Sequence, residues 1–393
     1  MPPSHPSFPC LAVVPPGLEE VAAQELTALG AVAVQPLRRA VACRVDLAGY
    51  YRLHLQARLP FRLLRELARF PCSQRQELYD GVQHAADWAT WLPPEHSLRV
   101  DASGSSGSLN HSHYTALQVK NALVDWQRQH WGARSTVNLE DPDLCLHLHL
   151  SAGRPGGRGG EAVLSVDGSG GSLHRRGYRR AMGLAPLKEN LAAGLIRLTG
   201  WDGQVPLADP MAGSGTLLIE AACSALGRAP GLQRSFALQR WPDFDATLWR
   251  QEQQAAAALA QQQPPHGHPL PPLLGLEQDP AVLAQAQANA EAAGVAPWIS
   301  LQQGDCRAFQ PPPGAPGLLV CNPPYGERIG DREDLEALYS DLGQMLKERC
   351  SGWTLWLLSG NPELTGALRL KASRRIPVSN GGIDCRWLRY ELR

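Results

Sequence analysis

The sequence lacks the features that mark membrane-spanning, secreted and zinc-binding proteins. No apolar run approaches the roughly 20 residues that cross a bilayer, and residues 1–10 lack the charged-then-apolar pattern of a signal peptide. The nine cysteines are scattered singly, and no two of them form a CxxC pair. Such a set argues against a zinc site or a disulfide framework and fits a reducing compartment. We therefore expect a cytoplasmic protein with no membrane segment and no structural metal.

Net charge is also absent, because 37 Lys and Arg balance 37 Asp and Glu. The charge of the whole chain therefore does not indicate a nucleic-acid partner, and local clusters matter more. Residues 1–180 have a small basic excess, with 19 Lys and Arg against 16 Asp and Glu. At 393 residues, 44% of them hydrophobic, the chain is long enough for two or three domains with substantial cores.

The two parts of the chain have different patterns. Residues 1–167 mix helices with short strands, some of which alternate apolar and polar residues as in a half-exposed sheet. This part is predicted to be α+β and carries no nucleotide-binding signal. After residue 190, strands and helices alternate, which favours a doubly wound parallel α/β sheet. Its strands are expected at residues 205–210, 273–277, 299–305, 318–322 and 353–360.

Other segments are predicted to close or interrupt these elements. Residues 374–392 form two strand patterns around an Asn-Gly-Gly turn, so a closing hairpin should add an antiparallel strand. Small polar residues at 101–115 and glycines at 151–160 predict loops. Residues 251–272 predict a helix extension followed by a surface loop.

The turn after the first strand of the second part predicts a ligand-binding loop. Residues 209–216 read D-P-M-A-G-S-G-T, and their glycines permit a close approach that a Cβ would block. Such loops lie at the carboxyl edge of the sheet, where these folds bind ligands. An acid followed by G-x-G suits a cationic ligand such as a methionine sulfonium, although a plain strand-to-helix turn is the alternative. The candidate cofactor contacts are Asp209, Pro210, Ala212, Gly213, Ser214 and Gly215.

Acidic residues also follow the next two strands. Glu277 ends the second strand and could accept hydrogen bonds from both ribose hydroxyls. Asp279 precedes a proline and is interpreted as a helix N-cap. Asp305 follows the third strand, where it could meet an adenine amino group or simply be a solvated loop acid. Three acids in register at strand ends favour S-adenosylmethionine as the cofactor.

The fourth strand leads into Asn322-Pro323-Pro324-Tyr325, the candidate catalytic loop. Two prolines stiffen the turn and remove backbone donors. The Asn322 side-chain oxygen and the Pro323 carbonyl could then accept both hydrogens of an exocyclic amine, next to the cofactor that Asn322 should also contact. Tyr325 could stack on the base, which is worth roughly 1–3 kcal/mol. Positioning should dominate such a transfer; the alternative is a rigid turn with a surface tyrosine.

Cys321 raises a rival mechanism, because methylation of pyrimidine C5 uses a cysteine nucleophile. This residue lies within the apolar strand, before the turn. A buried core cysteine is therefore the favoured interpretation.

Several motifs together resemble those of the THUMP-domain class I RNA methyltransferases. They are residues 174–179, 185–192, 209–222, 322–330 and 338–339. The resemblance spans nearly the whole chain and is closest to members that methylate guanine N2 in large-subunit ribosomal RNA. It implies a Rossmann-like methyltransferase domain at 190–393, a linker at 168–189, a THUMP domain at 51–167 and a ferredoxin-like segment at 1–50. Ala212 stands where relatives often have cysteine.

The resemblance also implies that RNA, most specifically 23S ribosomal RNA, is the partner. A basic stretch at 174–180 places arginines around a tyrosine, which suits phosphate contacts and base stacking, although a solvated linker is the alternative. Residues 188–190 could close over the cofactor or form a salt-bridged helix start. The predicted RNA contacts are Arg175, Arg176, Tyr178, Arg179 and Arg328.

Three competing functions stay open from the sequence. Guanine-N2 methylation of transfer RNA requires the same site, and adenine-N6 methylation of nucleic acid uses the same loop chemistry. The RNA-type first half argues against a DNA substrate. A non-enzymatic RNA-binding factor is disfavoured by the intact acids and the N-P-P-Y loop.

Overall fold

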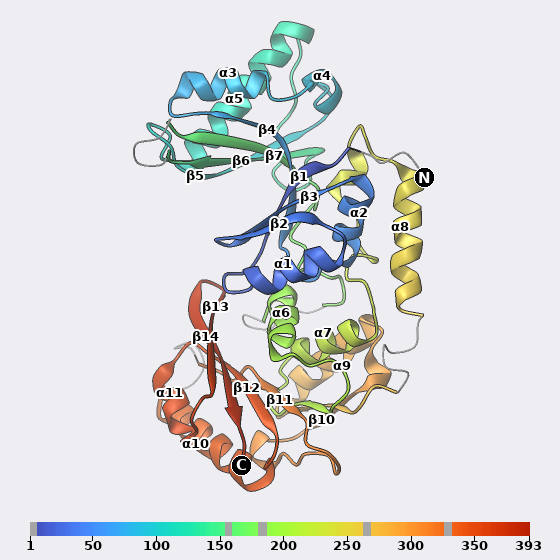
Figure 1. Ribbon diagram of the computed structural model, residues 1–393, viewed down its shortest axis with the longest axis vertical. Helices are drawn as coiled ribbons and strands as arrows, with labels where there is room; N and C mark the ends of the chain where they lie inside the picture. The colour runs from blue at the N-terminus through green and yellow to red at the C-terminus, as the bar shows by residue number, and fades with distance from the viewer. Residues whose placement is uncertain (1–5, 154–158, 180–186, 262–268, 326–331) are drawn as a thin grey trace.

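The protein, described by a computed structural model, consists of three lobes stacked in a line (Figure 1). The structure describes residues 6–153, 159–179, 187–261, 269–325 and 332–393. We call the lobes upper, middle and lower, as they lie in Figure 1. Among the described residues, no helix has the length and apolarity needed to cross a membrane.

A single seven-stranded sheet runs through the upper and middle lobes in the order β2-β3-β1-β4-β7-β6-β5. Its strands are β1 (Phe8–Val13), β2 (Val32–Leu37), β3 (Ala40–Val45), β4 (Arg62–Pro71), β5 (Leu98–Gly104), β6 (Leu144–Ser151) and β7 (Glu161–Asp167). The ten-residue strand β4 pairs with β1 through its first residues and with β7 along most of its length. Because β4 belongs to both lobes, they share one hydrogen-bonded sheet.

Helices cover this sheet in both lobes. They are α1 (Glu19–Ala28) and α2 (Leu47–Gln56) in the middle lobe, with α3 (Arg75–Gln83), α4 (Trp88–Trp91) and α5 (Ser112–Trp131) in the upper lobe. The domain boundary expected at residues 50 and 51 falls within α2. Strand β5 continues to Gly104, so the loop expected from residue 101 begins later. Each residue of β5 pairs in parallel with β6, and this ladder outweighs the weak strand propensity of Asp, Ser and Gly.

The lower lobe contains the second seven-stranded sheet, in the order β10-β9-β8-β11-β12-β14-β13. Its strands are β8 (Leu207–Asp209), β9 (Leu273–Glu277), β10 (Ile299–Gln303), β11 (Leu318–Cys321), β12 (Thr354–Ser359), β13 (Arg374–Asn380) and β14 (Ile383–Glu391). The strands from β10 to β12 are parallel, and β14 is antiparallel to β12. The predicted doubly wound sheet with a closing hairpin is confirmed.

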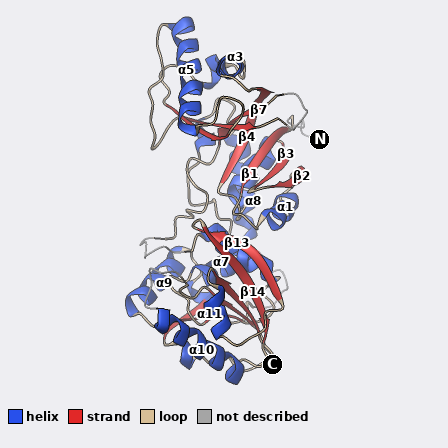
Figure 2. Ribbon diagram, turned by 90° about the vertical axis from the view of Figure 1, so that its left-hand side faces the viewer, coloured by secondary structure: helices blue, strands red, loops and turns tan. Residues whose placement is uncertain are grey.

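Helices cover both faces of the lower sheet: α10 and α11 lie beside one face (Figure 2), and residues of α7 and α9 belong to the core cluster on the other. The helices of this part of the chain are α6 (Glu189–Thr199), α7 (Thr216–Ala225), α8 (Ala246–Leu259), α9 (Pro280–Ala292), α10 (Arg332–Arg349) and α11 (Pro362–Ala367). Strand β8 lies between β9 and β11, so the strand order reverses there. Folds of this type bind ligands at the carboxyl ends of the strands beside such a reversal.

The segment between α7 and β9 reaches back to the middle lobe, where α8 lies beside α2 (Figure 1). Trp249 is 4% exposed and its ring lies edge-on to Tyr51, with the ring centroids 5.3 Å apart. Arg52 forms an ion pair with Glu252 at 2.8 Å. The sequence predicted the helix but not its partner, and residues 262–268 of the expected loop lie outside the described part. The middle and lower lobes are therefore joined by a buried aromatic contact as well as by the linker.

Candidate functional site

The loop after β8 presents a buried carboxylate beside two glycines with left-handed torsions. Asp209 is 1% exposed and accepts a hydrogen bond from the backbone N–H of Met211 at 3.0 Å. Burial raises the pKa of Asp209 to about 7; the bond from Met211 lowers it in part and repulsion from Glu277 raises it further. Because this pKa is near neutrality, a bound cation would lower it and favour the ionised carboxylate.

Gly213 and Gly215 adopt left-handed torsions, with φ of +53° and +78°. A Cβ at Gly213 would meet no atom within 4 Å, so the loop faces open space there. These torsions favour glycine at both positions. The open space beside Gly213 is where a ligand can approach the backbone. The α9 residue Asn289 supports this loop by donating to the Ser214 carbonyl at 3.2 Å. Asn289 was not predicted as a site residue, because Gln285, Gln287 and Glu291 make polar residues common along α9; only its place among the buried residues Ala286 and Ala290 distinguishes it.

Glu277 joins the first two strand ends. One carboxylate oxygen accepts from the backbone N–H of Gly213 at 3.0 Å, and the other from that of Asp279 at 2.9 Å. Asp279 caps α9 by accepting from Ala281 and Val282, so its predicted capping role is confirmed. A carboxylate has about four lone-pair sites, which leaves Glu277 able to accept further hydrogen bonds.

Asp305 caps a short 3-10 helix at Cys306–Ala308. It accepts from the backbone N–H of Arg307 at 2.8 Å and forms an ion pair with the same residue at 3.0 Å. That backbone hydrogen bond, together with the arginine charge, lowers the pKa of Asp305. Its side chain is 38% exposed, so it is ionised and accessible at the edge of the site.

The catalytic-loop candidate follows β11 directly, beside the reversal of strand order. The Asn322 side-chain oxygen is buried and has no hydrogen-bond partner among the described residues. A buried oxygen of this kind is costly and requires an explanation. The Pro324 carbonyl, by contrast, accepts from the Tyr339 hydroxyl at 3.2 Å. The turn is thus held by α10, and one acceptor in it is left for a donor from outside.

Tyr325 is fixed by the C-terminal hairpin. Its hydroxyl oxygen accepts from the Asn380 side-chain nitrogen at 2.7 Å and lies 3.7 Å from the Cys385 sulfur. Burial raises the pKa of Tyr325, so the phenol stays neutral. From the sequence, Asn380 is predicted only as a turn residue. Its contact with Tyr325 could not be predicted, because nothing local in the sequence links the hairpin to the loop.

Cys321 is fully buried in β11. Burial raises its pKa well above the usual range, and repulsion from Asp209 adds to the shift. A neutral thiol without access to a substrate is not a nucleophile. The interpretation of Cys321 as a core residue is confirmed.

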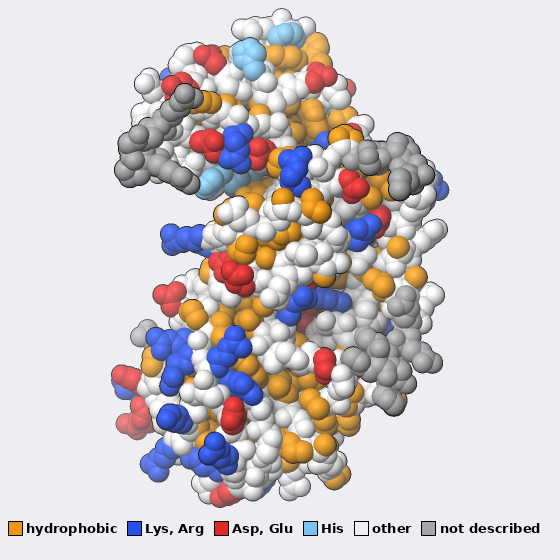
Figure 3. Space-filling view, viewed as in Figure 1, with side chains coloured by type: hydrophobic (Ala, Val, Ile, Leu, Met, Phe, Trp, Pro, Cys, Tyr) orange, Lys and Arg blue, Asp and Glu red, His pale blue; other side chains and the backbone are white. Residues whose placement is uncertain are grey.

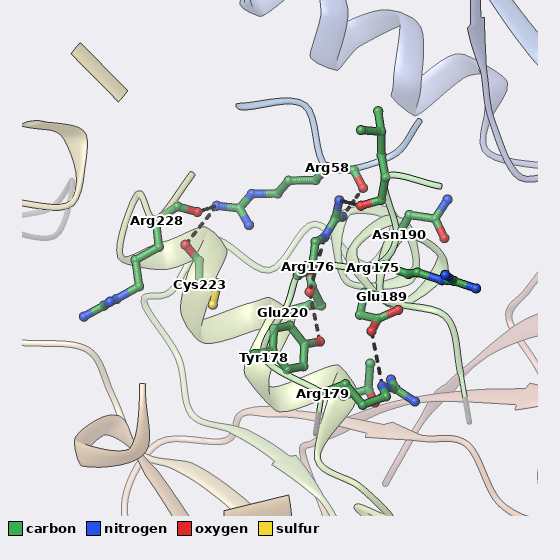
Figure 4. A network of polar contacts seen from close by, with 12 residues as sticks. Arg58, Arg175, Arg176, Tyr178, Arg179, Glu189, Asn190, Glu220, Cys223 and Arg228 are labelled. Carbon is green, nitrogen blue, oxygen red and sulfur yellow. Dashed lines mark hydrogen bonds and ion pairs between the residues drawn. The ribbon is translucent and has the colours of Figure 1, made fainter. Parts of the chain in front are cut away.

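The basic stretch at 174–180 has a different role from the one predicted (Figure 4). Tyr178 is 5% exposed, and its hydroxyl donates to Glu220 at 3.1 Å. Arg176 is also buried; it donates to the carbonyls of Leu173 and Arg58 and lies 3.7 Å from Glu220. Burial leaves Tyr178 no face for stacking and leaves Arg176 without access to phosphate. The prediction that these two residues contact RNA is therefore wrong for this structure.

Arg179 is likewise turned inward. It donates to the Thr216 hydroxyl and the Leu187 carbonyl, both at 2.9 Å, and forms an ion pair with Glu189 at 3.2 Å. Of the two options for residues 188–190, the salt-bridged helix start is thus observed. Because Thr216 begins α7, this arginine ties the linker to the glycine loop, which corrects its predicted RNA role.

The other two predicted RNA contacts have different outcomes. Arg175 is exposed and points away from the network in Figure 4, so its role stays a prediction. Arg328 lies outside the described residues. Within the described part of the chain, no three His, Cys, Asp or Glu side chains are grouped as a metal site.

Comparison with protein families identifies three regions of the chain. The RMKL-like methyltransferase domain model matches residues 176–389, which is more than half of the chain. The chain belongs to this family. A THUMP domain model matches residues 73–154 of the methyltransferase, and a RlmL ferredoxin-like domain model matches residues 9–64.

Curated relatives cover the chain from end to end. A Synechocystis sp. protein, provisionally named RNA methyltransferase slr0064, is 44% identical over 98% of this chain and 97% of its own length. The ribosomal RNA large subunit methyltransferase K/L of Pseudomonas entomophila is 40% identical over 98% of this chain. The chain spans only 52% of that second relative, about half its length.

A solved structure provides a comparison for the cofactor. SMU.472, provisionally named a methyltransferase and solved with SAH, matches with a TM-score of 0.84, 25% identity and 98% of each chain covered. This methyltransferase depends on S-adenosylmethionine. The residues fit that donor: the glycine loop faces open space, and acids follow β8, β9 and β10.

Proposed function

We propose that this methyltransferase modifies the exocyclic N2 amine of a guanine in 23S ribosomal RNA. The observation that carries the proposal is the buried and unpartnered Asn322 side-chain oxygen, next to the reversal of strand order. An exocyclic amine supplies the donor that this oxygen lacks. The ribosomal substrate is supported by the THUMP match and by the names of the K/L relatives.

The proposed chemistry depends on positioning rather than on a strong base. Asn322 and the Pro323 carbonyl accept the two amine hydrogens, which aims the nitrogen lone pair at the methyl group that S-adenosylmethionine supplies on a cationic sulfur. Tyr325, held by Asn380, offers a ring for the base. A base in this position must leave its helix or loop. Holding reacting atoms in line contributes several kcal/mol to such a transfer.

The strand-end acids are proposed to hold the cofactor. Glu277 accepts hydrogen bonds from the ribose, and Asp305 from the adenine amino group. The loop of Asp209, Pro210, Ala212, Gly213, Ser214 and Gly215 receives the methionine part, where the near-neutral Asp209 complements its positive charge. The backbone N–H of Gly213 already engages Glu277, so loop and ribose contacts would form as one unit.

The test compares the wild-type protein with Asn322→Ala and Asn322→Asp. Ribosomal RNA is isolated from a strain without the gene and incubated with labelled S-adenosylmethionine, and the product nucleosides are identified by mass spectrometry. We expect N2-methylguanosine with wild-type protein. Asn322→Ala should lose at least 100-fold in rate at nearly unchanged donor affinity, while Asn322→Asp, which keeps an acceptor oxygen, should retain measurable transfer.

The substrate alternatives are outcomes of the same assay. Total transfer RNA and duplex DNA are incubated beside ribosomal RNA under identical conditions. Labelling of transfer RNA alone would replace the substrate, and N6-methyladenosine as product would replace the target base. Wild-type turnover by Asn322→Ala would remove the catalytic assignment.

A further inference from the structure

The C-terminal hairpin concentrates positive charge in a chain whose net charge is zero. Residues 369–393 contain seven Lys and Arg against two acids, Asp384 and Glu391. Figure 3 shows Lys and Arg side chains gathered over the part of the lower lobe that Figure 1 colours red. A local excess of this kind attracts a polyanion even when the whole chain is neutral.

One face of this hairpin lines a groove of about 670 Å³. The groove, called the hairpin groove below, is lined by Gly360, Asn361, Thr365, Arg375, Cys385 and Arg386 among others. Arg386 pairs opposite Pro377, two residues beyond Arg375, so the two arginines lie on the same face of the hairpin. Both are exposed, and neither forms an ion pair within the described part of the chain. Asp384 also lines the groove, on the same face as Arg386, but forms no ion pair with either arginine in the described part of the chain. The groove thus carries two cationic side chains against one acid.

The hairpin groove adjoins the catalytic-loop candidate. Its residue Cys385 lies 3.7 Å from the Tyr325 hydroxyl oxygen. A Cβ at Gly360, also in the groove, would lie 3.1 Å from the Tyr325 ring. The Cys385 side chain lies on the opposite face of β14 from Arg386, so it contacts Tyr325 on the other face of the hairpin from the two arginines. Arg386 pairs with Ser359, the neighbour of Gly360. A strand whose base lies against Tyr325 would therefore pass over the end of β12 at Gly360 to bring its next phosphates to Arg386 and Arg375.

We propose that the hairpin groove binds the phosphodiester backbone of the RNA strand next to the target nucleotide, with Arg375 and Arg386 as its phosphate contacts. The inference rests on the proposed function for the position of the base. Guanidinium groups match phosphate oxygens with two parallel hydrogen bonds. The groove would hold the flanking strand in place, while Asn322 and Tyr325 hold the extruded base.

The test is the double charge reversal Arg375→Glu/Arg386→Glu. Its affinity for deproteinised large-subunit ribosomal RNA, from a strain without the gene, is measured across a salt titration. We expect at least a tenfold loss of affinity at low salt, and a salt slope smaller by about 1.4, since each phosphate contact with a single strand contributes about 0.7. The pair Arg375→Lys/Arg386→Lys keeps both charges and should restore most of the affinity.

Arg374→Glu is the control on the other face of the hairpin from Arg375. It reverses one charge, and it lies at the opposite end of β13 from Asn380, which contacts Tyr325. The single variant Arg375→Glu makes the same change of charge on the same strand and should lose more RNA affinity than Arg374→Glu. We expect the RNA affinity of Arg374→Glu to change less than threefold. Thermal unfolding and SAH affinity, equal to wild type in all variants, would show that the fold and the cofactor site are intact.

Two results would overturn the proposal. In the first, the double reversal has the same affinity and salt slope as Arg374→Glu. In the second, it methylates naked RNA normally but fails on ribosomal precursor particles, which would make the groove a site for a ribosomal protein. A failure of the proposed function gives a different result. RNA binding would still depend on Arg375 and Arg386, but no methylated guanine would form.

Discussion

The proposed contact of Asp209 with the cofactor predicts that cofactor binding depends on pH in a defined direction. Its pKa is raised to about 7 by burial in the free protein, so the carboxyl is about one-tenth ionised at pH 6 and about nine-tenths ionised at pH 8. The cationic donor binds the ionised form better. Affinity for S-adenosylmethionine should therefore rise up to about tenfold from pH 6 to pH 8, which corresponds to about 1.4 kcal/mol.

Calorimetry tests this prediction directly. Titrations at pH 6 in buffers of different ionisation enthalpy should show release of close to one proton per donor bound, because the bound cation lowers the pKa of Asp209. Asp209→Asn keeps an oxygen to accept from the Met211 N–H but cannot titrate, so its affinity should be flat over the same range. Equal slopes in wild type and Asp209→Asn would refute the assignment.

Stability of the free protein should change in the opposite direction. The native pKa of Asp209 lies above its unfolded value of 3.8, so the native state holds the proton more tightly. The stabilising contribution is complete below pH 4 and is lost as the pH rises through about 7. Urea midpoints measured without cofactor should therefore fall over this window more in wild type than in Asp209→Asn.

Two further predictions concern the joints between the lobes. Arg176→Met leaves the buried Glu220 without a cation and should reduce the free energy of unfolding by about 3–5 kcal/mol. Adding Glu220→Gln should recover part of this loss, as measured by urea titration. If the effects of the two substitutions simply add, the two side chains are not a pair. Trp249→Ala removes the ring packed on Tyr51 and should cost about 3–5 kcal/mol. Limited proteolysis should then cut between the middle and lower lobes, while the affinity for S-adenosylmethionine stays within twofold. Resistance to the protease equal to that of wild type would show that α8 does not hold these two lobes together.

The sequence predicted the elements whose signals are local. Asp209 and Glu277 end their strands and Asp305 closely follows the third. The carboxyl ends of parallel strands meet at one edge, so the grouping of these acids follows from the order of residues alone. The Asn-Gly-Gly turn at 380–382 likewise identified the hairpin, because the torsions that such a turn needs are encoded in its own residues.

What the sequence could not provide depends on partners far along the chain. Arg176 and Tyr178 look like RNA contacts because their neighbours are basic, but their partner Glu220 lies 42 residues beyond Tyr178. Basic neighbours in the sequence do not show whether a side chain is buried or exposed. The hairpin groove was missed for the converse reason: Arg375 and Arg386 share a face only through the register of β13 and β14.

The joints between the lobes also indicate which partner must move during recognition. The middle and lower lobes meet through the buried Trp249 and through the Arg176–Glu220 network, and Arg179 extends the linker contacts to Thr216 beside the glycine loop. A hinge at this junction would expose an aromatic ring and separate buried charges, each at a cost of several kcal/mol. Extruding one nucleotide costs only a few kcal/mol, and least where the base is already unpaired. The RNA should therefore deform to reach a rigid site, which favours a target guanine in a loop or bulge over one in a continuous helix.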